Sequence, residues 1–481
     1  MMLRIYNTLA GKKEVFHPIE SGKVKIYVCG PTVYDACHIG HARSVIVFDV
    51  IVRYFRSQGY DVTYIRNFTD IDDKIINRAN ELGTSTKELS ERNIQGFYDD
   101  MDALKVQRAT VEPKATEYIS KIIELIERLF EQELAYKAGG DVFYAVERFK
   151  DYGKLSGRKL EDMLAGARVE VDGRKRNPLD FVLWKGAKPG EPMWESPWGK
   201  GRPGWHIECS TMSTHFLGEN FDIHGGGKDL MFPHHENEIA QSEGAFGKPF
   251  ANFWVHNGFV RINKEKMSKS LGNFLMIKDL VREYHPETIR LFLLSCHYRS
   301  PVDFTKNAMQ EAEAGLDKIY ASLERLTQFV GSHTIRSDAG VVGEFWTRFC
   351  EAMDDDFNTA RAIGFMFDSV RQANRVLDNM GKSDSFQDTE MLYSLYADLM
   401  RAGKILGLGT ETPSEFFEQK KARSLGDEGV DETLIEKLVA ERLQARKEKD
   451  WAKADQVRDR LTAMNIVLED RSEGTVWKVK N

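Results

Sequence analysis

The sequence predicts an α/β protein of several domains, and three observations lead to that prediction. A chain of 481 residues is too long for one hydrophobic core, so roughly three or four domains are expected. The opening segment has the order strand, loop, helix, strand. Beyond about residue 310 the apolar spacing becomes helical throughout. We therefore expect a parallel-sheet domain followed by helical domains.

Composition narrows the class of protein. Apolar residues make up 42% of the chain and charged residues 29%, as in ordinary globular proteins. The N-terminus lacks the apolar core of a signal peptide, and no stretch is long and apolar enough to cross a membrane. Five scattered cysteines form no disulfide framework, so a cytoplasmic location is expected. A net charge of −7 means that a nucleic-acid partner would need a local basic patch.

The first 68 residues predict a βαβ unit. VKIYVC (24–29) is a short β-rich run, and the loop GPTVYDACHIGH follows it. ARSVIVFDVIVRYFRSQG has apolar residues at helical spacing and stops at Gly59, a natural C-terminal cap. DVTYIRNF then returns as a second strand. This unit predicts a Rossmann-like parallel sheet with a nucleotide-sized crevice at its strand ends.

The rest of the chain divides by pattern. After residue 112 an amphipathic helix, ATEYISKIIELIERLFEQ, leads into a hairpin that turns at Gly139 and Gly140. Sheet-like runs resume at NFDIH and FWVHNGFVRI, and the chain ends in two helices and a hairpin. The expected parts are a split Rossmann-type domain (1–111 and 204–262), an inserted connective subdomain (112–203), a connecting segment (263–312), a helical bundle (313–407), a weakly structured linker (408–430) and a small C-terminal domain (431–481).

Two histidines mark the start of the first helix. In CHIGHARS, His38 and His41 lie three residues apart where the loop enters the helix, with Gly40 between them. This places both imidazoles on one side of the first turn, near free backbone N–H groups that bind anions. The glycine allows a ligand to approach the backbone, and the imidazoles can donate to phosphate oxygens as charge develops. The alternative is a pair of helix-capping histidines.

A lysine-rich loop follows a later strand. INKEKMSKSLGNF carries Lys266 and Lys269, which can neutralise the phosphates of a bound triphosphate while its α-phosphorus is attacked. Alone, such a loop is a solvated turn. The nearby GGGKD (225–229) is not a Walker loop, because Asp229 follows the lysine where Ser or Thr is required.

One further run raises the question of a metal. FPHHENEIAQSE puts His234 and Glu238 four residues apart in a predicted helix. This pattern suits either a metal site or the polar start of a surface helix.

The motifs together resemble a known family. HIGH and KMSKS, about 225 residues apart, are unsubstituted and resemble the class I aminoacyl-tRNA synthetases. Further stretches, NFTDIDDKI, GWHIECSTMS and FDIHGGGKDLMFPHHENE, resemble the cysteinyl-tRNA synthetases, and the likeness covers essentially the whole chain. The resemblance implies activation of L-cysteine by ATP, with Mg²⁺, to cysteinyl-adenylate, followed by transfer to the 3′ end of tRNA(Cys). It makes the first domain catalytic and the last one anticodon-binding.

The resemblance also implies one zinc ion per chain, at the bottom of the active site. A parallel sheet brings distant strand ends together, and two thiolates, an imidazole and a carboxylate are suitable zinc ligands. Cys37 competes with the first ligand but belongs to the phosphate loop, and with Cys296 and Cys350 we interpret it as an ordinary thiol. The implied ligands are Cys29, Cys209, His234 and Glu238.

Zinc would solve a problem of selectivity. Cysteine and serine are nearly the same size, so pocket volume separates them poorly, whereas a thiolate binds zinc far better than a hydroxyl does. This predicts accurate selection without an editing domain. The insertion at 112–203 is interpreted as too short and too helical to be an editing barrel.

Other pocket residues are transferred by the resemblance. Asp229 would hold the substrate ammonium, and Trp205 would form an apolar wall beside the sulfur. Their alternatives are a helix cap for Asp229 and a core position for Trp205. Asp70, Asp72 and Asp73 in NFTDIDDK are interpreted as an acidic helix N-terminus rather than a magnesium site. The transferred pocket residues are Gly30, Thr69, Trp205, His224 and Asp229.

The C-terminal domain contains a candidate RNA contact. Trp451 and Asp455 lie four residues apart on one predicted helix face, within a segment (441–460) of seven basic and five acidic residues. A base can stack on the indole while the carboxylate binds its edge, as in recognition of unpaired RNA. In the resembling family these positions contact the anticodon. The alternative packs Trp451 into the core of the domain.

Three other functions remain for comparison. A cysteine ligase acting on a small amine shares both motifs and the zinc residues but lacks the C-terminal domain, so residues 415–481 favour tRNA. A zinc hydrolase would use Glu236 or Glu238 as its base but leaves both phosphate motifs unused. A non-catalytic RNA-binding protein has no need of HIGH and KMSKS. No apolar dimer face stands out, so a monomer is expected.

Overall fold

The computed structural model describes residues 2–158, 173–266, 274–332, 343–380, 385–428, 432–464, 466–471 and 474–479. The chain forms two compact units. The first comprises Met1–Leu316 with Ile335–Leu408, and the second comprises Asp317–Thr334 with Gly409–Asn481. No described helix combines the length and the apolar character needed to cross a membrane.

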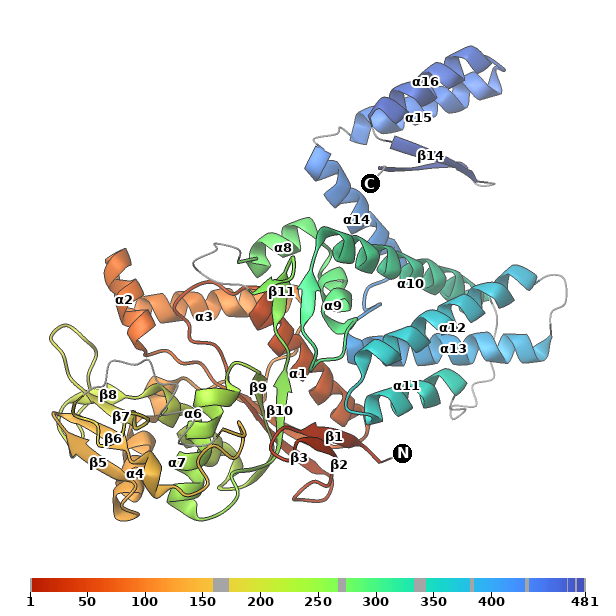
Figure 1. Cartoon of the computed structure of the whole chain (residues 1–481). Helices are drawn as coiled ribbons and strands as arrows, with labels where there is room; N and C mark the ends of the chain where they lie inside the picture. Colours follow the sequence, from red (N-terminus) through yellow and green to blue (C-terminus); the bar gives the residue numbers. More distant parts are fainter. Residues whose placement is uncertain are drawn as a thin grey trace. The chain divides into compact units, whose positions relative to one another are not determined.

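A four-stranded parallel sheet forms the centre of the first unit (Figure 1). Its strand order is β10-β9-β3-β4, so the chain leaves β3 toward one edge and later leaves β9 toward the other. The connections therefore diverge between β3 and β9, which places the ligand crevice at the carboxyl ends of these two strands. The strands are β3 (Lys23–Val28), β4 (Asp61–Arg66), β9 (Phe221–Gly227) and β10 (Ala251–Asn257).

Helix α1 (Ile39–Ser57) joins β3 to β4 and confirms the predicted βαβ unit. Its buried residues are mostly aliphatic and aromatic, because the helix covers the sheet. The helix stops two residues before Gly59, whose φ of 88° is easily adopted only by glycine. The sequence predicted this unit, but the helix begins at Ile39, three residues before the predicted start at Ala42.

Two helices cover the sheet beside the crevice. α6 (Trp205–Leu217) precedes β9, and α7 (Glu236–Phe246) follows it after a short π-helical turn, Met231–His235. The two helices contact each other, and α6 also contacts β3 and β4. They bring two separate parts of the sequence to the end of β3.

The predicted insertion (112–203) contains a four-stranded antiparallel sheet, so the interpretation of this region as mainly helical is wrong. Its strands have only three to six residues, too few for a clear alternating pattern, and only the Gly139–Gly140 hairpin was predicted. Before the insertion come α2 (Asp73–Leu82) and α3 (Thr86–Ala103). The insertion contains α4 (Ile119–Glu131), β5 (Ala135–Ala138), β6 (Asp141–Tyr144), β7 (Phe181–Gly186) and β8 (Gly201–Pro203).

Short elements and four long helices complete the first unit, and the helices confirm the helical pattern predicted beyond residue 310. The short elements are β1 (Arg4–Asn7), β2 (Lys12–Val15), β11 (Val260–Ile262), β12 (Glu265–Lys266), α8 (Ile277–Glu283), α9 (Pro286–Leu294) and β13 (Val302–Phe304). The long helices are α10 (Lys306–Ser332), whose last part belongs to the second unit, α11 (Glu344–Asp354), α12 (Thr359–Asn379) and α13 (Phe386–Leu406).

In the second unit, a helix occupies the segment where a weakly structured linker was predicted. Most of the segment 408–430 forms α14, because Thr412 and Glu415 make a capping box and the ring of Phe416 stacks on Tyr320 at 3.9 Å. The two helices and hairpin predicted after it are present. The elements are α14 (Pro413–Glu428), α15 (Glu432–Lys447), α16 (Trp451–Ala463), β14 (Ile466–Arg471) and β15 (Gly474–Val479).

Candidate metal centre and active site

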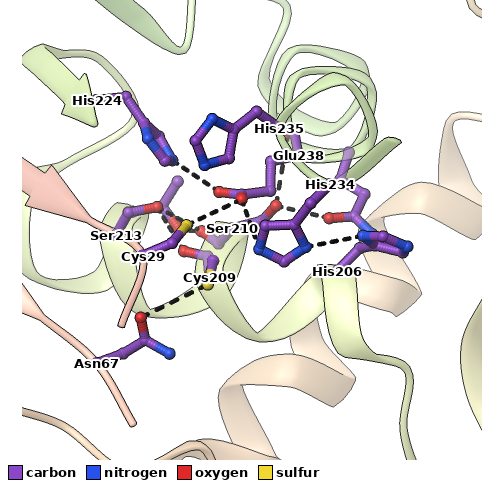
Figure 2. A network of polar contacts seen from close by, with 12 residues as sticks. Cys29, Asn67, His206, Cys209, Ser210, Ser213, His224, His234, His235 and Glu238 are labelled. Atoms are coloured by element: carbon purple, nitrogen blue, oxygen red, sulfur yellow. Dashed lines mark hydrogen bonds and ion pairs between the residues drawn. The ribbon is translucent and has the colours of Figure 1, made fainter. Parts of the chain in front are cut away.

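The structure brings the four predicted metal ligands together at the crevice. One potential ligand atom from each lies within 4.8 Å of those of the other three. Figure 2 shows the two sulfurs, the His234 ring and the Glu238 carboxylate facing a common centre. The residues come from four elements: Cys29 follows β3, Cys209 lies in α6, His234 lies in the π-helical turn and Glu238 lies in the first turn of α7.

The geometry of the cluster suits a divalent cation. The Cys29 thiol lies 3.3 Å from Oε1 of Glu238, and Nε2 of His234 lies 3.0 Å from the same oxygen. Cys209, His234 and Glu238 are at most 1% exposed. Two sulfurs, one nitrogen and one oxygen make a zinc-type donor set, and buried donors of this kind require a positive charge among them.

The pKa shifts indicate the same requirement. Burial lowers the pKa of His234, but the Glu238 carboxylate and Cys209 more than offset this effect and raise it to about 10. Burial raises the pKa of Cys209, whereas hydrogen bonds from Cys29 and His234 lower it to about 6. Without a metal the cluster thus favours a protonated imidazole beside an ionised thiolate and carboxylate. A cation bound at the centre would take the place of that proton.

Cys37 lies apart from this cluster. Its thiol is 6% exposed, and burial raises its pKa to about 12. Within the described residues it belongs to neither group of potential metal ligands. Cys296 and Cys350 are free and partly buried, so the three remaining cysteines have the ordinary environments that were predicted for them.

Four further histidines surround the cluster. Nε2 of His224 lies 2.8 Å from Oε2 of Glu238, and Nδ1 of His206 lies 2.9 Å from Nδ1 of His234. His235 contacts His256 at 2.8 Å. Burial lowers the pKa of His206 and His235 well below the usual range. By contacting Glu238 and His234, His224 and His206 orient these two predicted ligand side chains, as outer partners of metal ligands do.

Sequence reasoning proposed His224 for the amino-acid pocket and missed His206, His235 and His256. His224 is completely buried and contacts a predicted metal ligand rather than the pocket wall. Cys29, His224, His235 and Glu238 form a second group of potential ligand atoms within 4.8 Å. In the sequence, only the adjacent histidines in HHENE indicated a further histidine at the cluster. His206 and His256 reach it through the fold.

The histidines of HIGH cap helix α1. His38 is the N-cap residue, and its Nδ1 accepts a hydrogen bond from the Gly40 N–H at 3.1 Å. Nδ1 of His41 accepts one from the His38 N–H at 3.2 Å, and the two rings stack at 3.9 Å. The capping alternative is therefore observed. It does not exclude phosphate binding, because an Nδ1 that accepts places the ring proton on Nε2, where it can be donated to a ligand.

A cavity of about 380 Å³ reaches from Cys29 of the metal cluster to these histidines. Cys29, His38, His41, Trp205 and Asp229 all line it. Burial lowers the pKa of His41 to about 3, so this imidazole is neutral at physiological pH. The base of the crevice and the start of α1 therefore belong to one site.

The predicted amino-acid contacts fall into two groups. Trp205 lines the cavity and stacks on the His234 ring at 4.1 Å, so it is not simply a core residue. Asp229 lines the same cavity and makes no cap for the following turn. Gly30 lines it as well, and a side chain there would lie 1.6 Å from the carbonyl oxygen of Asn67. Thr69, in contrast, is 1% exposed and donates its hydroxyl to Glu208.

The structure does not describe the side chains of the two predicted phosphate-binding lysines. Lys269 lies outside the described residues, and of Lys266 only the backbone is described, paired with Arg261.

The acidic run NFTDIDDK has structural partners. Asp72 caps α2, the Asp70 carboxylate accepts from Thr116, and Asp73 pairs with Lys185 and Arg202. These contacts agree with the helix N-terminus that was preferred to a magnesium site.

In the second unit, the Trp451 side chain is exposed. It lies at the first position of α16 and is 60% exposed. The core of this unit contains Val457 and Leu461 but not Trp451, so the core alternative is wrong. Asp455 is also exposed, and its carboxylate pairs with Arg458 at 2.9 Å. The helix thus presents an indole and a carboxylate together at its surface.

Comparisons with known proteins cover the whole chain. A model of the tRNA synthetases class I (C) catalytic domain matches residues 15–314, a DALR domain model matches 348–411, and a model of the cysteinyl-tRNA ligase anticodon binding domain matches 433–477. The cysteine–tRNA ligase of Geotalea daltonii is 57% identical over 496 residues and that of Geobacter metallireducens 56% over 487, with all of both chains covered in each case. The chain belongs to the cysteine–tRNA ligase family.

Solved structures agree on the fold of this ligase family member. Methionyl-tRNA synthetase of Mycobacterium tuberculosis, solved with methionyl-adenylate, gives a TM-score of 0.59 at 17% identity, covering 80% of this chain and 90% of that one. A leucyl synthetase, LeuRS from Agrobacterium radiobacter K84, gives 0.58 at 12% identity, covering 82% and 85%. The predicted α/β fold and the resemblance to the cysteine–tRNA ligase family are both confirmed.

Proposed function

We propose that the chain activates L-cysteine with ATP, forms cysteinyl-adenylate, and transfers the cysteinyl group to the 3′ end of tRNA(Cys). One observation carries this proposal: a single cavity is lined both by Cys29, a member of the zinc-type donor set, and by His38 and His41. The relatives that match the whole chain are named cysteine–tRNA ligases, which supports the same reaction. Its place is the cytoplasm, and it acts as a monomer.

In the first step the carboxylate of cysteine attacks the α-phosphorus of ATP and pyrophosphate leaves. Nε2–H of His38 and His41 would donate to the phosphate oxygens as negative charge develops there. Gly40, which also lines the cavity, allows the nucleotide to approach the backbone. Lys266 and Lys269 would neutralise the phosphates, with Mg²⁺ accompanying ATP. No side-chain nucleophile is required, because alignment and charge stabilisation account for the catalysis.

Selection of cysteine depends on the base of the cavity. Cys29, Cys209, His234 and Glu238 would hold one zinc ion, and their donor atoms fit it. When bound there, zinc supplies a soft Lewis acid that takes a thiolate as a ligand in preference to a hydroxyl. Trp205, stacked on His234, would wall the substrate side chain. Asp229 on the cavity wall would receive its ammonium group, and Gly30 leaves room for the backbone.

Recognition of tRNA would involve the second unit. Trp451 exposes its ring for stacking on a base of the anticodon, and Asp455 would accept hydrogen bonds from the edge of that base. The match of residues 433–477 to an anticodon-binding domain supports this assignment and favours tRNA over a small amine as the acceptor.

The hydrolase alternative has little support in the site. The Glu236 carboxylate accepts backbone hydrogen bonds from Gly153 and Ser156 and is completely buried, so it is not available as a base. Glu238 is occupied by its contacts with Cys29 and His234. Neither carboxylate is free to activate a water molecule.

The test is aminoacylation of tRNA with labelled cysteine, with serine as the competitor. We expect cysteine to enter tRNA(Cys), and we expect serine to enter at a rate below about a hundredth of that of cysteine. If adenylate forms but tRNA is not charged, the chain is a ligase of a small amine instead. If neither product forms with zinc-loaded protein, the proposed reaction is wrong.

A further inference from the structure

A turn of the insertion, residues 152–156, binds one side of helix α7, which carries Glu238. The Glu236 side chain is completely buried, and its carboxylate accepts three backbone hydrogen bonds from this turn. The donors are the N–H groups of Gly153 at 3.0 Å, Leu155 at 3.3 Å and Ser156 at 2.9 Å.

The shape of the turn depends on its first glycine. Gly153 has a φ of 99°, which side-chain-bearing residues rarely adopt. This conformation allows successive N–H groups to point inward and to form a concave binding site for an anion. The carboxylate fills that site, so burial of its charge does not leave it unsatisfied.

Further contacts follow the same face of α7. The Tyr152 hydroxyl donates to Oδ1 of Asn237 at 2.5 Å, and Lys154 pairs with Glu243. From the insertion sheet, the Tyr144 hydroxyl donates to the carbonyl of Ala240 at 2.7 Å. Since positions 236, 240 and 243 share one side of a helix, the insertion holds α7 along its length.

The opposite side of α7 faces the metal cluster. The Glu238 carboxylate contacts Cys29 and His224, and His234 lies just before the helix. Rotation or translation of α7 would move the His234 and Glu238 donor atoms together relative to the two sulfurs. Metal sites tolerate errors of only about 0.5 Å, so the placement of the helix determines how well the site is formed.

We propose that Glu236 is a positioning residue for the metal centre: it locks the turn 152–156 onto α7 and so sets the positions of His234 and Glu238. The inference rests on the proposed function, because it assumes that zinc binds at this cluster. It also assigns a role to the insertion, which supports the amino-acid-selecting site through the contacts of residues 152–156 and Tyr144 with α7. We call these contacts the brace.

The test compares the Glu236→Gln variant with the wild-type protein, both full-length and loaded with zinc. A glutamine offers one acceptor oxygen and an NH₂ group that cannot accept, so part of the turn loses its partner. We expect zinc transfer to an excess of a chromogenic chelator to be about tenfold faster, and the KM for cysteine to rise while that for ATP stays unchanged. Ser242→Ala is the matched control, because this buried α7 hydroxyl has no hydrogen-bond partner among the described residues and the variant should release zinc at the wild-type rate.

The outcomes separate the two proposals. A folded Glu236→Gln protein that releases zinc at the wild-type rate overturns the positioning role. Absence of zinc from the wild-type protein contradicts the metal centre itself. If Glu236→Gln does not fold, Tyr152→Phe removes one hydrogen bond of the same brace, and we expect about fivefold faster release, since such a bond contributes about 1 kcal/mol. An unchanged rate in that variant also overturns the inference.

Discussion

The metal cluster of the first unit and the Trp451 surface of the second place their functional groups in opposite environments. At the cluster, Cys209, His234 and Glu238 are at most 1% exposed, and each is held by neighbouring side chains. On α16, Trp451 is 60% exposed, and its neighbour Asp455 makes a surface ion pair with Arg458. A small substrate must be distinguished by one atom, which requires fixed donors in a dry site. A large, partly unpaired RNA can instead be bound by exposed rings that reach its bases.

The largest expected effect is the loss of a cluster thiol. Cys209→Ser replaces a soft donor with a poor one, so we expect the protein to lose its zinc and adenylate formation from cysteine to fall by at least about 10³-fold. Zinc content by mass spectrometry and ATP–pyrophosphate exchange measure the two effects. Cys37→Ser is the control, because this buried thiol lies outside the cluster and the variant should keep its zinc. Equal losses in both variants would contradict the assignment.

Next in size is the effect of the HIGH histidines, which share the cavity but not the cluster. His41→Asn keeps a polar group near the cap of α1 but removes the Nε2–H donor, so kcat for exchange should fall by about 10²- to 10³-fold. Zinc content should stay at the wild-type level. A variant that loses zinc and kcat together would show that the two ends of the cavity are not independent.

The exposed surface should respond differently from the cavity. Trp451→Ala removes one stacking platform, worth about 1–3 kcal/mol, so the KM for tRNA should rise by about five- to 150-fold. Cysteine-dependent ATP–pyrophosphate exchange should be unchanged, because this reaction needs no tRNA. If charging is also unchanged, the indole is not an RNA contact.

The smallest expected effect concerns Asp100, a buried carboxylic acid for which no ligand is proposed. Burial of Asp100, with some repulsion from Asp99, raises its pKa to about 6, above the value of about 3.9 expected in the unfolded chain. The folded state therefore binds the proton more tightly, and stability falls as pH rises from about 4 to 6. Asp100→Asn removes this cost, so at pH 7.5 it should add about 1 kcal/mol to the free energy of unfolding and at pH 4 almost nothing. Thermal unfolding at the two pH values is the measurement, and an equal shift at both would contradict the sign.

Sequence reasoning succeeded where the signal was local. The βαβ unit, the cap at Gly59 and the terminal hairpin follow from periodicity and turn residues. It failed on the insertion sheet, whose strands are too short to show alternation, and on α14, whose capping box was overlooked in a charged segment.

At the site, residue types and motifs gave the four cluster residues only with the help of a family resemblance. Spacing in the sequence alone does not connect Cys29 with Cys209, because their proximity arises from the order of the sheet strands and the packing of α6. The partners His206 and His256 were missed for the same reason. The exposure of Trp451 was left open, because stacking on RNA and packing in a core require the same spacing.

The most direct test of the account is equilibrium binding of cysteine and serine, by calorimetry, to the zinc-loaded and the zinc-stripped protein. We expect the loaded protein to prefer cysteine by at least about a hundredfold, and we expect removal of the metal to abolish most of this preference. Restoring zinc should restore it. A preference for cysteine that survives removal of the metal would contradict the account, because the walls of the cavity would then select the substrate without zinc.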